Sequence, residues 1–242
     1  MNNVNFKSRY NPVPGFSINT KLGKLNVKEV SLKDKNIDND IVQSANLFLY
    51  NYATNTKDPG LLRFLNTSKK EYKRGVYNFA DFIKKTLKTD DGNITYLIAR
   101  DSSGKIQASC ITSSLDEFGG VCDKNTLYVN NVAVNKNYRG NHVGSIMTNK
   151  IIDASQNRFS DLVLVADNYA IPSYKKGWNL EIFDPKDATQ LKALDIMAKS
   201  RPDYPDYATF MHKPLDNNKT RWWERLVTLV EKKETPWWKK LF

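Results

Sequence analysis

Hydrophobic and polar residues recur along the chain with two different periods, which separate the expected helices from the expected strands. Apolar side chains repeat at helical spacing over residues 41–52, 72–87 and 187–199. Short runs rich in β-branched and aromatic residues predict strands. These runs lie at residues 25–31, 95–100, 106–113, 127–134, 162–166, 180–183 and 207–213. The order of elements predicts an α+β sheet with one central βαβ crossover, in which residues 116–124 form a loop.

The two ends of the chain differ from this middle part. Residues 1–24 are polar, contain Pro12 and Pro14 and show no periodicity, so we predict an extended basic arm. Residues 218–242 hold four of the five tryptophans and predict a short amphipathic, basic helix ended by Pro236. The predicted domain therefore spans residues 25–217, between an extended N-terminal arm and a Trp-rich C-terminal tail.

Two interpretations of the tail stay open. In the first, the tail packs on its own domain or on a sister subunit. Packing on a sister subunit would make the protein a homo-oligomer. Alternatively, tryptophan and leucine on one side with lysine and arginine on the other suit a membrane surface or the groove of a partner protein. Nucleic acid is disfavoured, because the tail has few basic groups and its tryptophans would need bases to stack on.

Composition narrows the class of protein. With 242 residues, 40% of them hydrophobic, the chain can bury a substantial core. The formal charge of +11 divides unevenly, since each end carries +4 and residues 25–217 carry +3. Cys110 and Cys122 lack metal-ligand spacing, which argues against zinc and for a reducing compartment. The N-terminus shows no signal peptide, so we expect a cytoplasmic protein, peripheral to a membrane or part of a larger assembly if the tail serves that purpose.

A glycine-containing turn joins a predicted strand to a predicted helix. The strand ends in Val132-Ala133-Val134, the helix begins near Val143, and the intervening residues 135–142 include no acidic side chain. Unpaired N–H groups and the positive end of the helix dipole favour an anion at such a position. From these residues alone, the turn is either an ordinary connection or a binding loop for a pyrophosphate.

The turn resembles motif A of the GCN5-related N-acetyltransferases (GNAT), in which a hydrophobic-Ala-Val triplet leads into Arg-Gly-x-Gly-x-Gly and a helix. Arg139 and Gly144 match that pattern, whereas His142 stands at the middle glycine. A second segment resembles motif B of the family, with its residues at Asn168, Ala170, Tyr174 and Gly177. The resemblance implies a GNAT-like mixed, partly splayed β-sheet with flanking helices over residues 25–215.

The same resemblance implies transfer of an acetyl group from acetyl-coenzyme A to an unidentified amine. Backbone groups of Val132 and Val134 would pair with the pantetheine arm, and Asn168 would also contact the cofactor. The residues expected to hold the pyrophosphate are Arg139, Gly140, Asn141, His142, Val143 and Gly144. For His142, three roles stay open: incidental, phosphate-binding, or obstructing, and a positive φ there would strain the turn.

The resemblance also implies that Tyr174 is the general acid, and a phenol with a pKa of about 10 can protonate a leaving thiolate. The alternative for Tyr174 is a core aromatic residue with a solvated hydroxyl. The family's usual carboxylate positions hold Asn130 and Asn131. Asp116 and Glu117 are the candidate bases, acting through water, although no base at all is a second interpretation. The other functional class is a weak or inactive GNAT-fold module that serves a larger assembly through its terminal arms.

Overall fold

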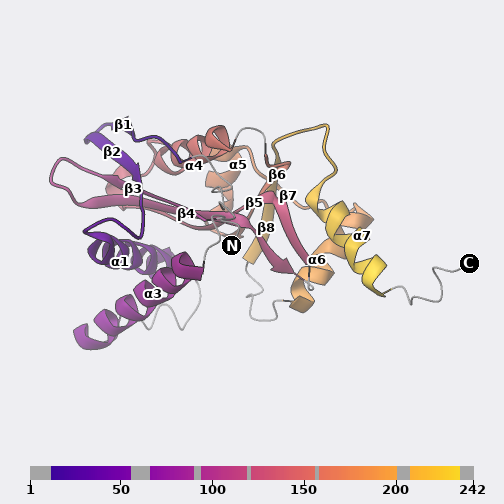
Figure 1. The fold of residues 1–242 in the computed structure, drawn as a ribbon, viewed down its shortest axis with the longest axis horizontal. Coiled ribbons are helices and arrows are strands. Elements are labelled where there is room, and N and C mark those ends of the chain that lie inside the picture. The colour runs from indigo at the N-terminus through magenta and orange to yellow at the C-terminus, as the bar shows by residue number, and fades with distance from the viewer. Residues whose placement is uncertain are drawn as a thin grey trace, which may run out of the picture. The chain divides into compact units, whose positions relative to one another are not determined.

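A computed structural model describes residues 12–55, 66–89, 94–118, 121–155, 158–200 and 208–234. These residues form an α+β fold with eight strands and six helices (Figure 1). The strands follow the hydrogen-bonded order β1-β2-β3-β4-β5-β6-β8-β7. The chain divides into two compact units: Met1–Thr112 with Asn130–Gln156, and Ser113–Val129 with Asn157–Phe242.

The first unit is built on an antiparallel meander. Its strands are β1 (Phe16–Thr20), β2 (Gly23–Glu29), β3 (Thr95–Arg100), the start of β4 (Ile106–Phe118) and the end of β5 (Val121–Val134). β1, β2, β3 and β4 pair in succession, each antiparallel to the next. The N–H of Asn135 donates to the carbonyl of Gln107 at 2.8 Å, so the chain is still hydrogen-bonded to β4 where β5 ends.

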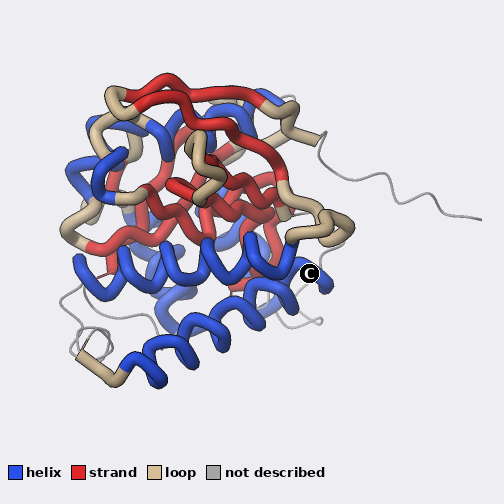
Figure 2. Tube along the Cα trace, turned by 90° about the vertical axis from the view of Figure 1, so that its left-hand side faces the viewer, coloured by secondary structure: helices blue, strands red, loops and turns tan. Residues whose placement is uncertain are grey.

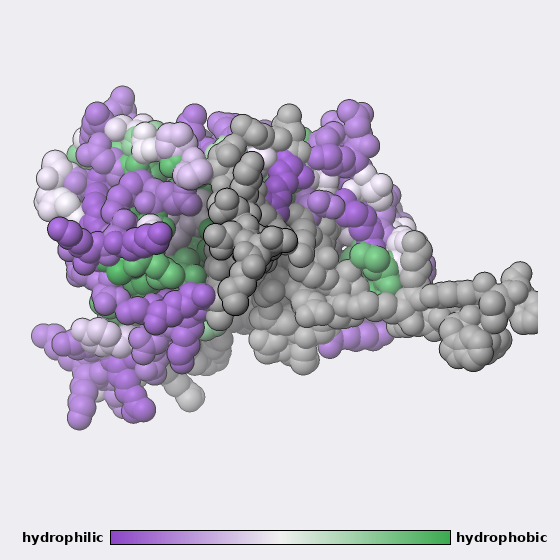
Figure 3. Space-filling view, viewed as in Figure 1, coloured by the Kyte–Doolittle hydropathy of each residue, from purple (hydrophilic) through white to green (hydrophobic). Residues whose placement is uncertain are grey.

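Two long helices lie side by side on one face of these strands, α1 (Ile37–Asn55) and α3 (Lys69–Thr89), while α4 (Val143–Ala154) lies on the other face (Figures 1 and 2). Helix α3 is amphipathic, and its buried side chains include Val76 and Ile83. Its outer surface is mainly hydrophilic (Figure 3).

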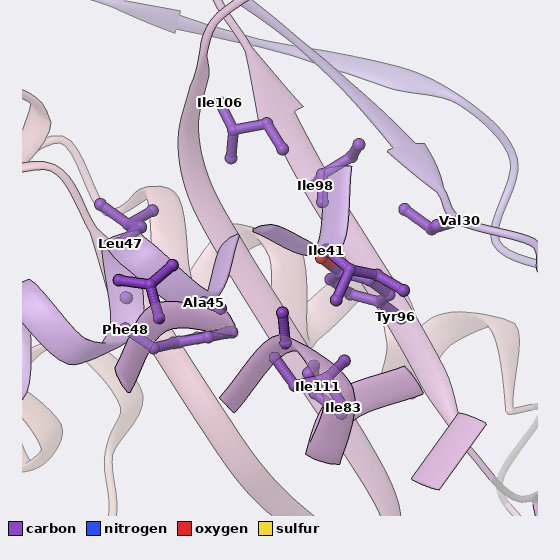
Figure 4. Close-up of a cluster of buried hydrophobic side chains, with 13 residues drawn as sticks. Val30, Ile41, Ala45, Leu47, Phe48, Ile83, Tyr96, Ile98, Ile106 and Ile111 are labelled. Atoms are coloured by element: carbon purple, nitrogen blue, oxygen red, sulfur yellow. The ribbon is translucent and has the colours of Figure 1, made fainter. Parts of the chain in front are cut away.

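The core beneath α1 and α3 joins both helices to the strands (Figure 4). The side chains labelled there come from α1, α3, β3, β4 and the segment after β2, which shows how residues far apart in sequence share one cluster. They are Val30, Ile41, Ala45, Leu47, Phe48, Ile83, Tyr96, Ile98, Ile106 and Ile111. Removal of this apolar surface from water is the main stabilising contribution to the first unit.

Two segments differ from the sequence-based expectation. Residues 16–20, which the sequence analysis includes in the extended arm, form β1. Apolar Phe16 and Ile18 alternate with polar Ser17, and the strand pairs antiparallel with β2. Gly23 at φ 116° completes the turn between the two strands. Residues 116–124 were expected to form a loop, but β4 continues to Phe118 and β5 begins at Val121. The sequence analysis therefore missed β1, and it made the strands on both sides of residues 116–124 too short.

The second unit is centred on β6 (Asp161–Asp167), which is parallel to β5 over Thr126–Val129 and antiparallel to β8 (Ala208–Pro214). β8 also pairs with the short strand β7 (Glu181–Ile182). The parallel pair makes the sheet mixed, as predicted. The helices of this unit are α5 (Ile171–Trp178), α6 (Ala188–Ser200) and α7 (Trp222–Glu234).

Helix α7 comes from the predicted tail and packs within the second unit. Trp222 is fully buried and Trp223 is 6% exposed, in one cluster with Phe183 and Met197. The described part of the tail therefore follows the alternative in which it packs on its own part of the chain, while residues 235–242 lie outside the described residues. None of the helices in the described ranges combines the length and the hydropathy of a membrane-spanning segment.

Candidate functional site

The glycine turn, residues 139–142, follows β5 through a short 3-10 helix, Lys136–Tyr138. The Asn141 side chain donates to the carbonyls of Tyr138 at 3.0 Å and Arg139 at 3.3 Å, which fixes the turn from inside. Gly140 has φ 79°, and a Cβ built on it would meet no atom within 4 Å. The left-handed backbone thus favours glycine at position 140, and the space that a side chain would occupy there is open.

Helix α4 begins directly after this turn and leaves its first amides unpaired. Within the described residues, the N–H groups of Val143, Gly144 and Ser145 donate to no acceptor, and the first turn contains no acidic side chain. Val143 and Gly144 are buried, as is Met147 on the next turn, so packing fixes the start of the helix. These amides and the helix dipole form an anion-binding arrangement, which we call the open N-terminus of α4.

His142 precedes α4 with φ 56° and ψ 19°, in the left-handed region. The turn therefore has at His142 the positive φ that strains a residue other than glycine. The side chain of His142 is exposed and makes no capping hydrogen bond to the helix. The imidazole therefore does not fill the open N-terminus of α4 within the described residues.

The guanidinium of Arg139 is hydrogen-bonded to other residues of the first unit. Its Nε donates to the carbonyl of Val134 at 3.3 Å, and an Nη donates to Oδ1 of Asn51. Asn51 is buried in α1, and its own amide donates to the carbonyl of Leu47 at 2.7 Å. Arg139 thereby connects the turn to α1, a contact between residues 88 apart in sequence that no sequence pattern indicated.

The end of β5 supplies the other predicted cofactor contacts. The parallel ladder between β5 and β6 spans Thr126–Val129 and stops before Val132 and Val134. The backbone groups of these two residues are therefore not part of that ladder. This meets the requirement that they be able to pair with an extended ligand.

Asn168 and Tyr174 belong to the second unit. Asn168 is exposed after β6 and accepts a hydrogen bond from Thr209 at 3.1 Å. Tyr174 is half-buried on α5, where its ring contacts Trp178 edge-on at 5.2 Å between centroids. The side chains of Asp116 and Glu117, the predicted bases, lie outside the described residues.

The two asparagines at the family's carboxylate positions differ in environment. Asn131 accepts a hydrogen bond from the hydroxyl of Tyr52 on α1 at 2.7 Å. Oδ1 of Asn130 is buried and has no hydrogen-bond partner among the described residues. The helical pattern over residues 41–52 predicts only an apolar role for Tyr52, and the sequence does not indicate its hydrogen bond to Asn131.

The large pKa shifts concern buried groups of the first unit. Burial raises the pKa of the Cys110 thiol to about 12, and the pKa of Tyr96 also to about 12. Cys110 packs against Thr148 of α4 at 3.6 Å between sulfur and oxygen. A thiol that stays protonated is a poor nucleophile, so Cys110 serves packing rather than catalysis. No group of three or more potential metal ligands occurs within the described part of the chain.

Comparison with known proteins gives a family and a fold. Residues 61–178 match the model of the acetyltransferase (GNAT) family. The acetoin utilization protein from Exiguobacterium sibiricum is similar in structure, with TM-score 0.52, 10% identity and coverage of 90% of this chain and 92% of that one. The GNAT domain of S. lividans PAT gives TM-score 0.48, 13% identity and coverage of 83% and 97%. No curated protein matches the chain.

Proposed function

The chain belongs to the GNAT acetyltransferase family, and from that premise we propose that it is an acetyl-coenzyme A-dependent N-acetyltransferase. The observation that carries the proposal is the open N-terminus of α4. Three consecutive amides there have no acceptor among the described residues, and Gly140 in the preceding turn faces open space. A diphosphate would supply the missing acceptors and the negative charge that the helix dipole favours.

The residues around this loop fit the remainder of the cofactor. The backbone groups of Val132 and Val134 lie outside the β5–β6 ladder, and they would pair with the amides of a pantetheine arm. Arg139 would keep the loop fixed through Val134 and Asn51 while the phosphates bind. We also retain Asn168 as a proposed cofactor contact.

Bound acetyl-coenzyme A would supply an activated thioester, on which an amine forms a C–N bond while the C–S bond breaks and sulfur takes the electron pair. The amine loses one proton, and the sulfur gains one. We assign the second transfer to the hydroxyl of Tyr174, since a phenol remains protonated at neutral pH. Asp116 and Glu117 stay the proposed acceptors of the amine proton, through water.

Calorimetric titration with acetyl-coenzyme A tests this function, and the chain offers a matched pair of variants. Gly140 and Gly104 have similar φ angles, 79° and 82°, and both face open space. Gly140→Ala and Gly104→Ala should each cost about 1 kcal/mol of stability or more, because alanine is strained at positive φ. Only Gly140→Ala should weaken acetyl-coenzyme A binding. The absence of heat at about millimolar ligand with the unaltered chain would overturn the function.

The alternative function is a GNAT-fold module with weak or no catalysis that acts in a larger assembly. Asparagine at both of the family's carboxylate positions favours it. An amide cannot accept and hold a proton, so neither Asn130 nor Asn131 can serve as a base. Binding of acetyl-coenzyme A without acetyl transfer to any amine would support this alternative.

A further inference from the structure

Asn131 lies on β5 immediately before the proposed pantetheine contacts, on the face covered by α1 and α3. Alternate residues of a strand share a face, and Ala133 packs in the core beneath these helices. On that face the hydroxyl of Tyr52 donates to Oδ1 of Asn131 at 2.7 Å. The contact joins residues 79 apart in sequence and lies entirely within the first unit.

Tyr52 is itself held in position by packing. Its ring stacks on Phe48 with 6.3 Å between centroids and 17° between planes. Phe48 is fully buried and meets Phe79 of α3 edge-on at 6.2 Å. Because the phenol is anchored in this way, its hydroxyl holds the amide of Asn131 in one orientation.

This orientation decides what Asn131 offers to a neighbouring molecule. Its oxygen is already used by Tyr52, and its Nδ2 has no acceptor within the described residues. The free side of the amide therefore presents two N–H donors. Such a group recognises an oxygen with lone pairs and cannot accept a hydrogen bond from an ammonium group.

We propose that Nδ2 of Asn131 contacts the acetyl acceptor, and that the acceptor is an α-amine beside a carbonyl oxygen, as at the N-terminus of a peptide. This inference rests on the proposed function and names its acceptor class. The carbonyl accepts from Asn131, while the amine one carbon away attacks the thioester. Tyr52 acts as a positioning residue through the hydrogen bond that orients the amide.

The low pKa of an α-amine suits a site in which Asn130 and Asn131 replace the family's carboxylates. At pH 7 about a tenth of an α-amine with a pKa near 7.8 is neutral, against roughly four parts in ten thousand of a lysine side chain. An α-amine therefore needs far less help from a base before it can attack. Hydrogen-bonding pattern and proton affinity point to the same class of acceptor.

The test measures coenzyme A release by the full chain with two matched acceptors, phenylalanine amide and 2-phenylethylamine, compared at equal concentrations of neutral amine. The unaltered chain should prefer phenylalanine amide at least about tenfold, the value of one good hydrogen bond. Asn131→Asp keeps the acceptor for Tyr52 and replaces the NH2 group by oxygen. It should reduce that preference at least about tenfold, and Tyr52→Phe should reduce it by a smaller factor.

Asn46 provides the matched control, because it also accepts a tyrosine hydroxyl, from Tyr72 at 3.0 Å, on the surface of α1. Asn46→Asp should leave the preference unchanged. An unchanged preference in Asn131→Asp, or no transfer to either acceptor by a chain that binds acetyl-coenzyme A, would overturn this inference alone. Failure of the unaltered chain to bind acetyl-coenzyme A would instead overturn the proposed function, and this inference with it.

Discussion

Helices α4 and α6 begin in opposite ways. At α6 the carboxylate of Asp187 accepts the N–H groups of Thr189 at 2.9 Å and Gln190 at 3.0 Å. At α4 the residue in the same place is His142, whose side chain makes no capping bond. The cap stabilises the start of α6, whereas the first amides of α4 have no acceptor among the described residues, which is what the proposed diphosphate site requires.

Two other helices follow the pattern of α6. At α3 the side chains of Ser68 and Glu71 each accept the other's backbone N–H, at 3.3 and 3.2 Å, a reciprocal capping box. At α7 the N–H of Trp222 donates to the buried carboxylate of Asp161 at 3.1 Å. Helix α5 also has no side-chain cap and no acidic side chain in its first turn, so the missing cap alone does not distinguish α4. What distinguishes α4 from α5 is the glycine turn that precedes it, in which Gly140 faces open space.

The largest effect on the free energy of unfolding is expected from removal of the carboxylate that caps the N-terminus of α7. Asp161 is fully buried and accepts from Arg221 at 3.1 Å, from Trp222 and from Ser160 at 2.7 Å. Asp161→Ala leaves these donors and a largely buried guanidinium uncompensated, so it should lower the free energy of unfolding by about 3–5 kcal/mol. Urea denaturation measures this loss.

Asp195 is the control for that substitution, since its ion pair with Lys199 on α6 is exposed. Asp195→Ala should change the free energy of unfolding by less than about 1 kcal/mol. If Asp161→Ala were no more destabilising than this control, the buried carboxylate would not be what secures the start of α7.

The next effect is expected from a carboxylate placed at the open N-terminus of α4. His142→Asp puts a negative charge where the proposed diphosphate binds, and it should weaken acetyl-coenzyme A binding about tenfold. His142→Asn is the matched neutral variant, since both residues tolerate the left-handed backbone. Equal affinities of the two variants, measured by calorimetry, would show that no anion binds at this position.

Local sequence patterns predicted those parts of the fold and of the site that depend on neighbouring residues. The strand at 95–100 and the helix beginning at Val143 were found by periodicity, and the glycine turn by its residues. The hydrogen bonds from Arg139 to Asn51 and from Tyr52 to Asn131 were not found, because the folded chain alone brings these residues together. The proposed contact with the acceptor rests on the second of these hydrogen bonds.

A smaller effect on the free energy of unfolding is expected at acidic pH, through the aromatic cluster that contains His212. His212 is 4% exposed between Phe183 and Trp223, at 4.9 and 4.6 Å between ring centroids. Burial lowers the pKa of His212; Glu181 and Asp161 nearby oppose this shift, and Arg221 adds to it. His212 therefore binds a proton more readily in the unfolded chain than in the folded chain.

Stability from neutral His212 should be complete above pH 6.5, the unfolded value, and should fall as the pH drops through the lower folded pKa. Urea denaturation between about pH 5 and pH 8 measures this dependence. His212→Phe keeps an aromatic ring and removes the titration, so its stability should fall less over the acidic part of this range. Parallel curves for the two proteins would mean that His212 titrates alike in both states.

The smallest effect is expected at the backbone of His142. Relief of a left-handed φ by His142→Gly should contribute about 1 kcal/mol, but glycine loses more conformational entropy on folding, about 0.5–1 kcal/mol. The two contributions oppose each other, so the free energy of unfolding should change by less than about 0.5 kcal/mol.

His142→Ala keeps the strain without the ring and without histidine's tolerance of this conformation, and it should be less stable than His142→Gly. If thermal denaturation ranked alanine above glycine, the left-handed start of α4 would not persist in solution, and the amides would not be presented to an anion in this arrangement.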